Sequence, residues 1–538
     1  MRGFLVALLL ALLVAPALAE TSPLIIDRAR SDRTEPKPGH RQHQLAQPKP
    51  VNRLAQVTPF VLTGVRIEGT SLAPAVLGDA TKAFIGQTVD AKAIGEIANK
   101  VSAAYASGGD VALYTVTVPD QDFAGGVLRL IVTEGYIEHV DVNGDVEGDV
   151  SRVVSLAGKL TVERPLRRST LERYLSLIRD LPGLTVDAQL LAGSAAGAVK
   201  LSLTLKQKDH ALALSFNDGG SSLLGRFQVQ ADLTLYNLLR EGEETTLSLG
   251  TSTIVSRYQY FALSHGEALD DEGTRAGASY GYLHTRVPSF ALDGTAQTAQ
   301  VYISHPVIRS YDENLSLVAS LDSIDSSNAL LGQLLANEHV RAFRLSAGYS
   351  LTDPDWLLSL GASANFGLDI LGAGVGDPLA ADSDFKKIVL QGRYNHLLGA
   401  DWVVRLHLVS QLASDRLPVS ELYALGGAEF GRAFLSASAL GDSAVAGSLE
   451  VGFAPKVLPS WLTGTEFFVF ADDGMTWYRA RHAAAAIDFD LASAGAGIRI
   501  PVGAKTRLEL QAADALRADA PGTRAGEWRF LFALTYGD

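Results

Sequence analysis

Residues 226–235 read RFQVQADLTL, and in this stretch every odd-numbered position is apolar while every even-numbered position is polar. A period of two is typical of a β-strand, because successive side chains point to opposite faces of a sheet. The alternation returns at residues 343–351, 402–408, 445–453 and 527–536. About 16 such segments follow residue 208, an even number within the range of bacterial outer-membrane barrels. Residues 208–538 are therefore predicted to be all-β.

Composition and the lengths of the apolar runs help to decide whether this sheet lies in a membrane. The chain is 47% hydrophobic, yet beyond its N-terminus no stretch has the roughly 18 consecutive apolar residues of a transmembrane helix. A membrane barrel spreads its lipid-facing residues over alternate positions. A soluble β-sandwich also alternates, but the length of the pattern and the aromatic strand at residues 528–536 favour a membrane barrel. In lipid all backbone groups must pair, so the sheet has to close.

The N-terminus carries an export signal. Residues 1–19 combine the basic Arg2, the short apolar run Phe4–Val14 and the small-residue cleavage pattern Ala17-Leu18-Ala19, which together predict a secretory signal peptide. The chain contains no cysteine, which excludes disulfides and thiolate metal or redox sites. The net charge of -13 argues against nucleic-acid binding as a main task.

Residues 20–59 are rich in proline and charge, as at Pro36, Pro38, Pro48 and Pro50, and are predicted to form a linker. Within this linker, Leu24–Arg33 is long enough for about two turns of helix; a solvated tail is the alternative.

Residues 60–137 are predicted to form a compact α+β module. Apolar side chains recur at helical spacing at Ile94, Ile97, Val101 and Tyr105. A strand precedes this helix and two strands follow it, with a shorter helix before it, so the expected order is β-α-α-β-β.

Residues 138–207 are predicted to repeat this plan with little sequence identity. Ser169 and Glu172 have the spacing of a capping box at the start of a helix. Leu181-Pro182-Gly183 is expected to end that helix, because proline cannot continue it and glycine can turn. Two strands then lead into the barrel.

One loop of the barrel stands out. Residues 425–434 read LGGAEFGRAF and lead through Gly441-Asp442 into the strand at 445–453. On the later strand at 466–474, Asp472 shares a face with Phe468 and Phe470. A loop folded into the lumen would bring Arg432 to Asp472, and the planar fork of arginine can bind a carboxylate at two points. The alternative is a surface loop with an exposed arginine.

These residues carry a family resemblance that covers nearly all of the mature chain. The chain resembles the outer-membrane transporters of two-partner secretion, which export filamentous haemagglutinins and haemolysins and belong to the outer-membrane insertase superfamily. Residues of the two modules that resemble polypeptide-transport-associated (POTRA) domains include Glu134, Gly135, Pro182 and Gly183. The loop and barrel motifs of the family are matched by Gly426, Gly427, Gly431, Arg432, Phe434, Gly441, Asp442, Phe470, Asp472 and Gly474. The family loop usually has glycine after its arginine, whereas Ala433 stands here.

The resemblance implies a barrel of about 16 strands in the outer membrane, preceded by two periplasmic POTRA-like domains. It also implies export of an unfolded β-rich partner, an adhesin or haemolysin, with the barrel assembly machinery acting during biogenesis. If the assigned parity holds, polar side chains line the lumen at Arg226, Gln228, Arg344, Gln391, Arg393 and Arg405.

Three other functions compete with export: an insertase, an enzyme and a passive pore. An insertase for other outer-membrane proteins remains the alternative, although two modules and the Leu181-Pro182-Gly183 segment favour an exporter. An enzyme or a passive pore has less support. No nucleotide-binding loop or metal-ligand spacing is present, and the scattered histidines form no motif. We therefore expect no enzymatic activity, no cofactor and no metal.

Overall fold

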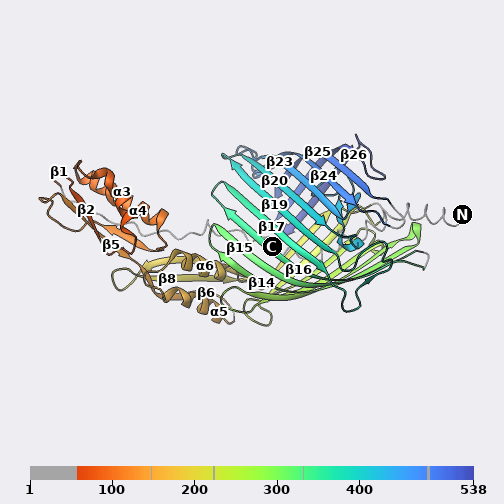
Figure 1. Cartoon of the computed structure of the whole chain (residues 1–538), viewed down its shortest axis with the longest axis horizontal. Coiled ribbons are helices and arrows are strands. Elements are labelled where there is room, and N and C mark those ends of the chain that lie inside the picture. The colour runs from red at the N-terminus through yellow and green to blue at the C-terminus, as the bar shows by residue number, and fades with distance from the viewer. Residues whose placement is uncertain (1–56, 147, 222–223, 331–332, 482–484) are drawn as a thin grey trace. The chain divides into compact units, whose positions relative to one another are not determined.

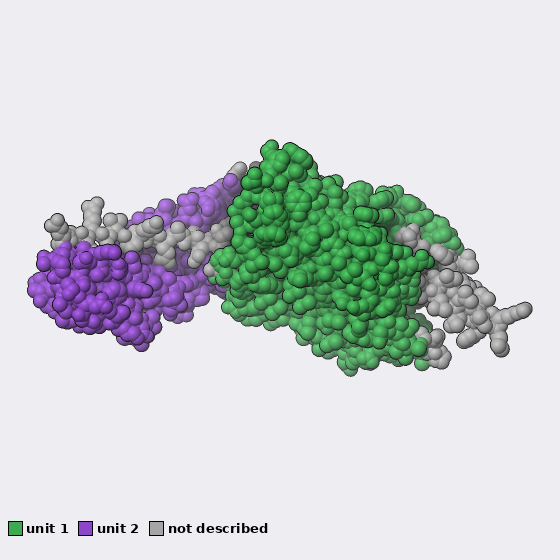
Figure 2. All heavy atoms as spheres, turned by 90° about the horizontal axis from the view of Figure 1, so that it is seen from above, with its two compact units in different colours: residues 1–39, 208–308, 312–538 green, residues 40–207, 309–311 purple. Residues whose placement is uncertain are grey.

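The computed structural model describes residues 57–538 except 147, 222–223, 331–332 and 482–484. The predicted signal peptide and the linker up to residue 56, with its short helix, lie outside the described residues. Two compact units are distinguished by colour in Figure 2. One unit comprises residues 208–308 and 312–538, and the other comprises the described part of 40–207 with 309–311. Among the described residues, no helix has the length and apolarity that a membrane crossing requires.

The first module is a three-stranded sheet with helices (Figure 1). Strand β5 lies in the middle, parallel to β2 and antiparallel to β4. The elements are β1 (Phe60–Val61), β2 (Gly64–Glu68), α3 (Pro74–Thr81), η2 (Lys82–Phe84), β3 (Thr88–Val89), α4 (Ala91–Gly108), β4 (Tyr114–Thr117) and β5 (Val127–Glu134).

Helix α4 begins where the sequence supplies a cap. Asp90 accepts a hydrogen bond from the Ala93 backbone N–H at 2.9 Å, which satisfies one of the free donors of the first turn. The apolar side chains at Ile94, Ile97 and Val101 recur on one face and are fully buried. Burial of this face against the sheet forms the module's core.

The second module has the same sheet plan, with β8 parallel to β6 and antiparallel to β7. Its elements are β6 (Tyr136–Asp145), α5 (Ser151–Gly158), η3 (Lys159–Thr161), α6 (Arg168–Arg179), β7 (Leu184–Ala192) and β8 (Ala198–Gln207). The repeated plan implies a helix before α6 without giving its residues; in the structure this helix is α5, and Val153, Leu156 and Ala157 form its short buried face.

The predicted capping box at the start of α6 is wrong. The helix begins at Arg168 without a side-chain cap. Ser169 lies inside the first turn, where its N–H and its hydroxyl donate to Asp110 at 2.9 and 2.8 Å. Asp110 comes from the turn between α4 and β4 of the first module, so a carboxylate distant in sequence accepts the hydrogen bonds of this first turn.

Within the described residues, sixteen long antiparallel strands and the two-residue β18 (Gly374–Val375) form a closed barrel, which confirms the predicted fold class. Closure joins the first strand to the last, from Asn217 opposite Ala533 to Ala213 opposite Gly537. The long strands are β9 (His210–Asn217), β10 (Gln228–Tyr236), β11 (Glu244–Ser252), β12 (Tyr258–Ala268), β13 (Arg275–Val287), β14 (Leu292–Arg309), β15 (Glu313–Leu330), β16 (Gln333–Thr352), β17 (Trp356–Gly367), β19 (Lys386–Leu398), β20 (Trp402–Ala413), β23 (Ser443–Phe453), β24 (Glu466–Tyr478), β25 (Ile487–Val502), β26 (Thr506–Ala518) and β27 (Trp528–Gly537).

Alternation along β24 shows how the wall is built. Phe467 and Val469 leave 43% and 57% of their surface exposed on the outside of the barrel. Phe468 and Phe470, between and beyond them, are buried on the inner face. An apolar outer face and a filled or polar inner face are what a barrel in lipid requires.

The segment between β20 and β23, residues 414–442, is called the inward loop. It contains the short turn η6 (Val419–Glu421) and a two-stranded hairpin, β21 (Tyr423–Leu425) with β22 (Ala439–Gly441). Its apolar side chains Leu425, Phe430 and Phe434 pack into one cluster with wall residues such as Ala446 and Leu491. The loop therefore lies against the inner face of the wall.

Candidate functional site

Three glycines shape the turn that carries Arg432. Gly426, Gly427 and Gly431 have φ of 105°, 107° and 70°, a region that side-chain-bearing residues rarely adopt. A Cβ atom on Gly426 would lie 2.3 Å from the carbonyl oxygen of Leu435. Glycine is therefore required for both conformation and close approach. Ala433 is not among the residues with positive φ, so alanine at this position brings no backbone strain.

Arg432 is buried against strands β23 and β24. Its Nη1 donates to Glu450 Oε2 at 3.1 Å, and its Nη2 donates to the Ser448 hydroxyl at 3.1 Å. The guanidinium carbon lies 4.1 Å from the centre of the Phe470 ring, which adds a cation–π contact. The arginine is thus held mainly by a carboxylate that the sequence reasoning did not single out.

Asp472 forms an ion pair with Arg432, although the guanidinium does not bind this carboxylate at two points. The shortest approach is 3.7 Å, between Arg432 Nε and Asp472 Oδ2. The other oxygen, Oδ1, accepts from the Gly431 N–H at 2.7 Å and from the Ser493 hydroxyl at 2.6 Å. Since Asp472 already receives these donors, its role in the structure is to hold the loop backbone, with a longer-range attraction to the guanidinium.

The remaining motif glycines make room for the loop. A Cβ on Gly474 would lie 2.6 Å from Leu425 Cδ1, so a side chain here collides with the loop. A Cβ on Gly441 would lie 2.7 Å from Thr476 Cβ. Phe434, by contrast, fills space and is 4% exposed.

Asp442 holds the two ends of the inward loop in place. Its two oxygens accept from the backbone N–H of Leu417 at 2.6 Å and of Arg479 at 2.8 Å. The Arg481 guanidinium donates to both oxygens at 3.0 and 2.9 Å. Asp442 itself is fully buried. One carboxylate thus joins the two ends of the loop to the turn after β24.

Glu450 also belongs to a charge network along the wall. Arg499 Nη1 contacts Glu450 and Glu466 at 2.6 Å each, and Arg405 Nη1 contacts the same two residues at 2.9 and 2.7 Å. Arg499 Nε adds Glu509 at 2.9 Å. The alternation of side chains along the strand predicted that Arg405 lies on the inner face, but it did not indicate the partners of Arg405. The network fixes the carboxylate that receives Arg432.

A second charged cluster binds the inward loop to other strands of the wall. Glu421, at the end of η6, contacts Arg344 of β16 and Lys387 of β19. Glu421 was not predicted as a site residue. The direction of its side chain could not be predicted from the sequence, because the alternation that reveals inward-facing residues applies only to strands.

The other predicted lumen residues also have partners. Gln228 is buried, and Arg226 donates to Asp218 Oδ2 at 3.0 Å. Arg393 approaches Glu429 of the inward loop at 3.8 Å. The side chain of Gln391 lies against Gly361, where an added Cβ would meet its Cγ at 2.7 Å.

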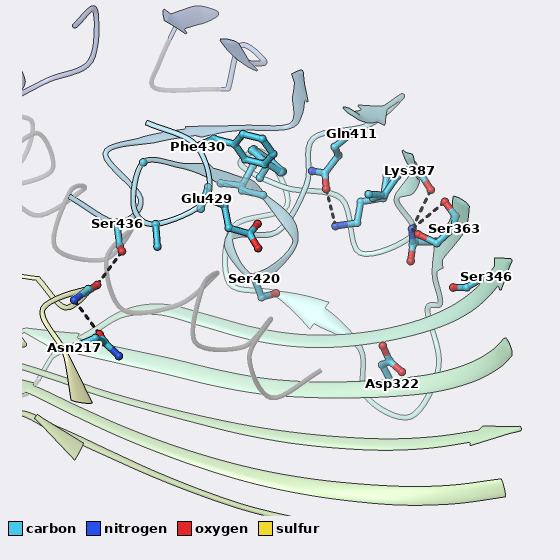
Figure 3. Close-up of a pocket in the computed structure, with 18 of the residues that line it drawn as sticks. Asn217, Asp322, Ser346, Ser363, Lys387, Gln411, Ser420, Glu429, Phe430 and Ser436 are labelled. Atoms are coloured by element: carbon cyan, nitrogen blue, oxygen red, sulfur yellow. Dashed lines mark hydrogen bonds between the residues drawn. The ribbon is translucent and has the colours of Figure 1, made fainter. Parts of the chain in front are cut away.

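A cavity of about 710 Å³ remains between the inward loop and the barrel wall, where strands β9, β14–β17, β19, β20, β26 and β27 line it (Figure 3). Ser346, Ser363, Lys387 and Gln411 line it from the wall, and Ser420 lines it from the loop. The lining mixes polar and apolar side chains, and its charged residues are Asp218, Asp322, Arg344, Lys387, Glu429 and Glu509. Among the described residues, no group of three or more histidines and carboxylates is arranged to hold a metal ion.

In the modules the predicted motif residues stabilise turns. Glu134 accepts from the Tyr105 hydroxyl at 2.6 Å and from the Ser71 N–H at 2.6 Å. Burial, together with the hydrogen bond to Glu134, raises the pKa of Tyr105, so the phenol stays protonated and donates. A Cβ on Gly135 would lie 2.8 Å from Leu113 Cβ. Gly183, after the buried Pro182, has φ of 70° and turns the chain into β7.

Comparison with known proteins identifies relatives of the whole arrangement. Residues 197–500 match the family described as haemolysin secretion/activation protein ShlB/FhaC/HecB, and residues 60–135 match the ShlB-type POTRA domain. Outer membrane transporter CdiB of Dickeya dadantii (strain 3937) is 25% identical over 66% of this chain and 65% of its own length. Heme/hemopexin transporter protein HuxB of Haemophilus influenzae (strain 86-028NP) is 24% identical over 54% of this chain and 52% of its own length. The chain thus aligns with about half to two thirds of the curated relatives.

Solved structures share the fold. CdiB from Escherichia coli superposes with a TM-score of 0.70 at 17% identity, covering 97% of this chain and 98% of that one. BamA from Haemophilus ducreyi, lacking POTRA domains 1–3, gives a TM-score of 0.51 at 16% identity, covering 89% and 100%. Since the family match covers more than half of its residues, this chain belongs to the haemolysin secretion/activation protein family ShlB/FhaC/HecB, as an outer-membrane β-barrel with periplasmic POTRA domains.

Proposed function

We propose that this protein exports an unfolded partner protein from the periplasm to the cell surface or medium by two-partner, type V secretion. The observation that carries the proposal is the inward loop, which buried charges hold inside a barrel whose remaining lumen is hollow and lined by charged, polar and apolar side chains. A passive pore does not need a loop fixed at several points.

The periplasmic modules are suited to receive an extended chain. In each three-stranded sheet the middle strand is fully paired, while β2 and β4, or β6 and β7, lie at the edges. An edge strand can accept an extended segment as an added strand, and the bonds are made to backbone, so many sequences can be bound. We propose that the partner is recognised there before it enters the barrel.

The lumen would then serve as a route that tolerates any sequence. Serine, asparagine and glutamine side chains on the wall of the cavity offer weak hydrogen bonds to a passing backbone. Binding that is weak and repeated along the wall allows a chain to keep moving.

The partner is proposed to be a β-rich adhesin or haemolysin, and we assign no enzymatic activity to the exporter itself. The sequence has no nucleotide-binding loop, so we propose that folding of the partner outside the cell drives transport. The barrel assembly machinery is proposed to insert the barrel itself.

The test is co-expression with the product of a neighbouring reading frame that encodes a long, signal-bearing β-helical protein. We expect this partner in the medium only when the full exporter is present. A variant that lacks residues 60–207 should give no secretion while its barrel still shows a heat-dependent shift in gel mobility. Undiminished secretion by that variant would contradict the receiving role of the modules. If instead the amounts of other outer-membrane proteins fall when the exporter is absent, the insertase function is favoured.

A further inference from the structure

The inward loop has a second attachment that none of the motif residues provides. Glu421 of η6 is 1% exposed, although it is a carboxylate. Arg344 of β16 donates two hydrogen bonds to this carboxylate, from Nη2 to Oε1 at 2.7 Å and from Nη1 to Oε2 at 3.3 Å. Lys387 Nζ of β19 lies 2.9 Å from Oε2. The two-point fork that was expected at Arg432 is therefore found at Arg344.

The backbone of the same turn is held by the same wall. Glu338 of β16 accepts from the N–H groups of Val419 and Ser420 at 2.8 and 3.3 Å. Lys387 Nζ donates to the carbonyl oxygen of Glu421 at 2.8 Å. Gln411 Nε2 donates to that carbonyl at 3.1 Å. Strands β16, β19 and β20 thus converge on one short turn.

The charges of this cluster depend on one another. Arg344 is also bonded to Asp322 of β15 and to Asn365 of β17. Both cations are nearly inaccessible to water, with side-chain exposures of 10% for Arg344 and 6% for Lys387. A buried cation is tolerated only while a carboxylate compensates it. Removal of the Glu421 charge would therefore weaken the hold on the loop and favour entry of water.

The cluster lies at the edge of the hollow part of the lumen. Asp322, Lys387 and Gln411 of the wall and Ser420 of the loop line the cavity of about 710 Å³ (Figure 3). Arg432 holds the tip of the same loop on β23 and β24. The loop is thus attached to two different parts of the wall, to β16 and β19 through Glu421 and to β23 and β24 through Arg432.

We propose that Glu421 is a positioning residue that latches the first arm of the inward loop onto β16 and β19, and that breaking this latch opens the lumen while Arg432 still holds the tip. The inference rests on the proposed function only in taking the lumen as the route of transport. It assigns the closed state to a named ion cluster, separate from the loop motif.

The test is single-channel conductance of the purified full chain in planar lipid bilayers. Glu421→Gln keeps the size of the side chain and removes its charge. We expect the open probability to rise on the order of tenfold relative to the unmodified chain. The matched control is Glu527→Gln, the same substitution in the barrel loop between β26 and β27, where the side chain is 61% exposed. This control should conduct as the unmodified chain does.

A conservative variant separates latching from general destabilisation. Glu421→Asp retains the charge, so it should restore a closed channel at least partly, whereas a purely structural defect would not depend on charge. Unchanged conductance of Glu421→Gln in a correctly inserted barrel would overturn the proposal. If Glu421→Gln does not insert, Lys387→Gln is measured instead and must also raise conductance. Failure of both variants to insert would likewise overturn it, because the cluster would then serve barrel folding and not closure.

The conductance measurement needs no partner protein. If the latch variants open the channel but the unmodified chain secretes no partner, the proposed function fails and the latch stands. If secretion occurs and the variants remain closed, the latch fails alone.

Discussion

Leu191 on β7 of the second module and Leu449 on β23 of the barrel leave the same fraction of their surface exposed, 49%. Leu191 faces the aqueous periplasm, whereas Leu449 faces the hydrocarbon of the membrane. Both strands alternate their side chains with a period of two. The exposed fraction of a leucine therefore does not by itself say whether that side chain stabilises the fold. Exposure is unfavourable in water and favourable in hydrocarbon.

The interiors of the two regions also differ in polarity. The core of the first module is apolar, with Leu128 and Leu130 completely buried. The interior of the barrel buries carboxylates such as Glu450 and Asp472 at 3% and 4% exposure. Such groups are stable there only because each has a cation or a hydrogen-bond donor next to it. Three substitutions can break or sharpen this contrast.

The largest effect is expected for Leu128→Asp. A carboxylate without a partner in an apolar core costs at least about 4 kcal/mol, a large share of the stability of a small module. We expect the first module to become sensitive to proteolysis and secretion to be lost. The barrel should keep its heat-dependent mobility shift, because it has its own core. Loss of that shift would show that the two regions are not independent.

A smaller effect is expected for Leu449→Arg, near the middle of the outward positions of β23. A cation facing lipid costs about 2–4 kcal/mol at the centre of a membrane. Urea titration of folding into lipid vesicles measures this cost. A change below about 0.5 kcal/mol would mean that this face of β23 does not contact hydrocarbon.

The smallest effect is expected for the matched substitution Leu191→Arg. Because this side chain already faces water, the free energy of unfolding should change by no more than about 0.5 kcal/mol. Thermal unfolding of the modules within the full chain, followed by proteolysis, provides the measurement. A cost equal to that of Leu449→Arg would remove the contrast between the two regions.

The fold class could be predicted because the barrel follows a simple local rule. A strand in lipid must alternate, so the stretch 226–235 and its later counterparts are visible without any tertiary information. The repeated plan of the modules implies helix α5, but its residues could not be located because its eight residues offer only one short apolar face. The N-terminus of α6 was misread because Asp110, far away in sequence, supplies the oxygens.

The candidate site could be predicted in part. Strand parity placed Asp472 on the inner face, and the glycine pattern indicated a folded-in loop, so Arg432 and Asp472 were expected to be neighbours. Parity does not distinguish which of several inward carboxylates an arginine will bind, and Glu450 is the nearer partner. Glu421 lies in a loop, where no period reveals the direction of a side chain.

Secretion by the Arg432→Ala variant tests the central claim most directly. The amount of partner in the medium is measured together with barrel insertion, and Arg524→Ala, whose side chain is 83% exposed, serves as the control. If a buried guanidinium holds the loop in its working position, Arg432→Ala inserts normally but secretes much less, while Arg524→Ala secretes as before. Full secretion by an inserted Arg432→Ala barrel would contradict the account.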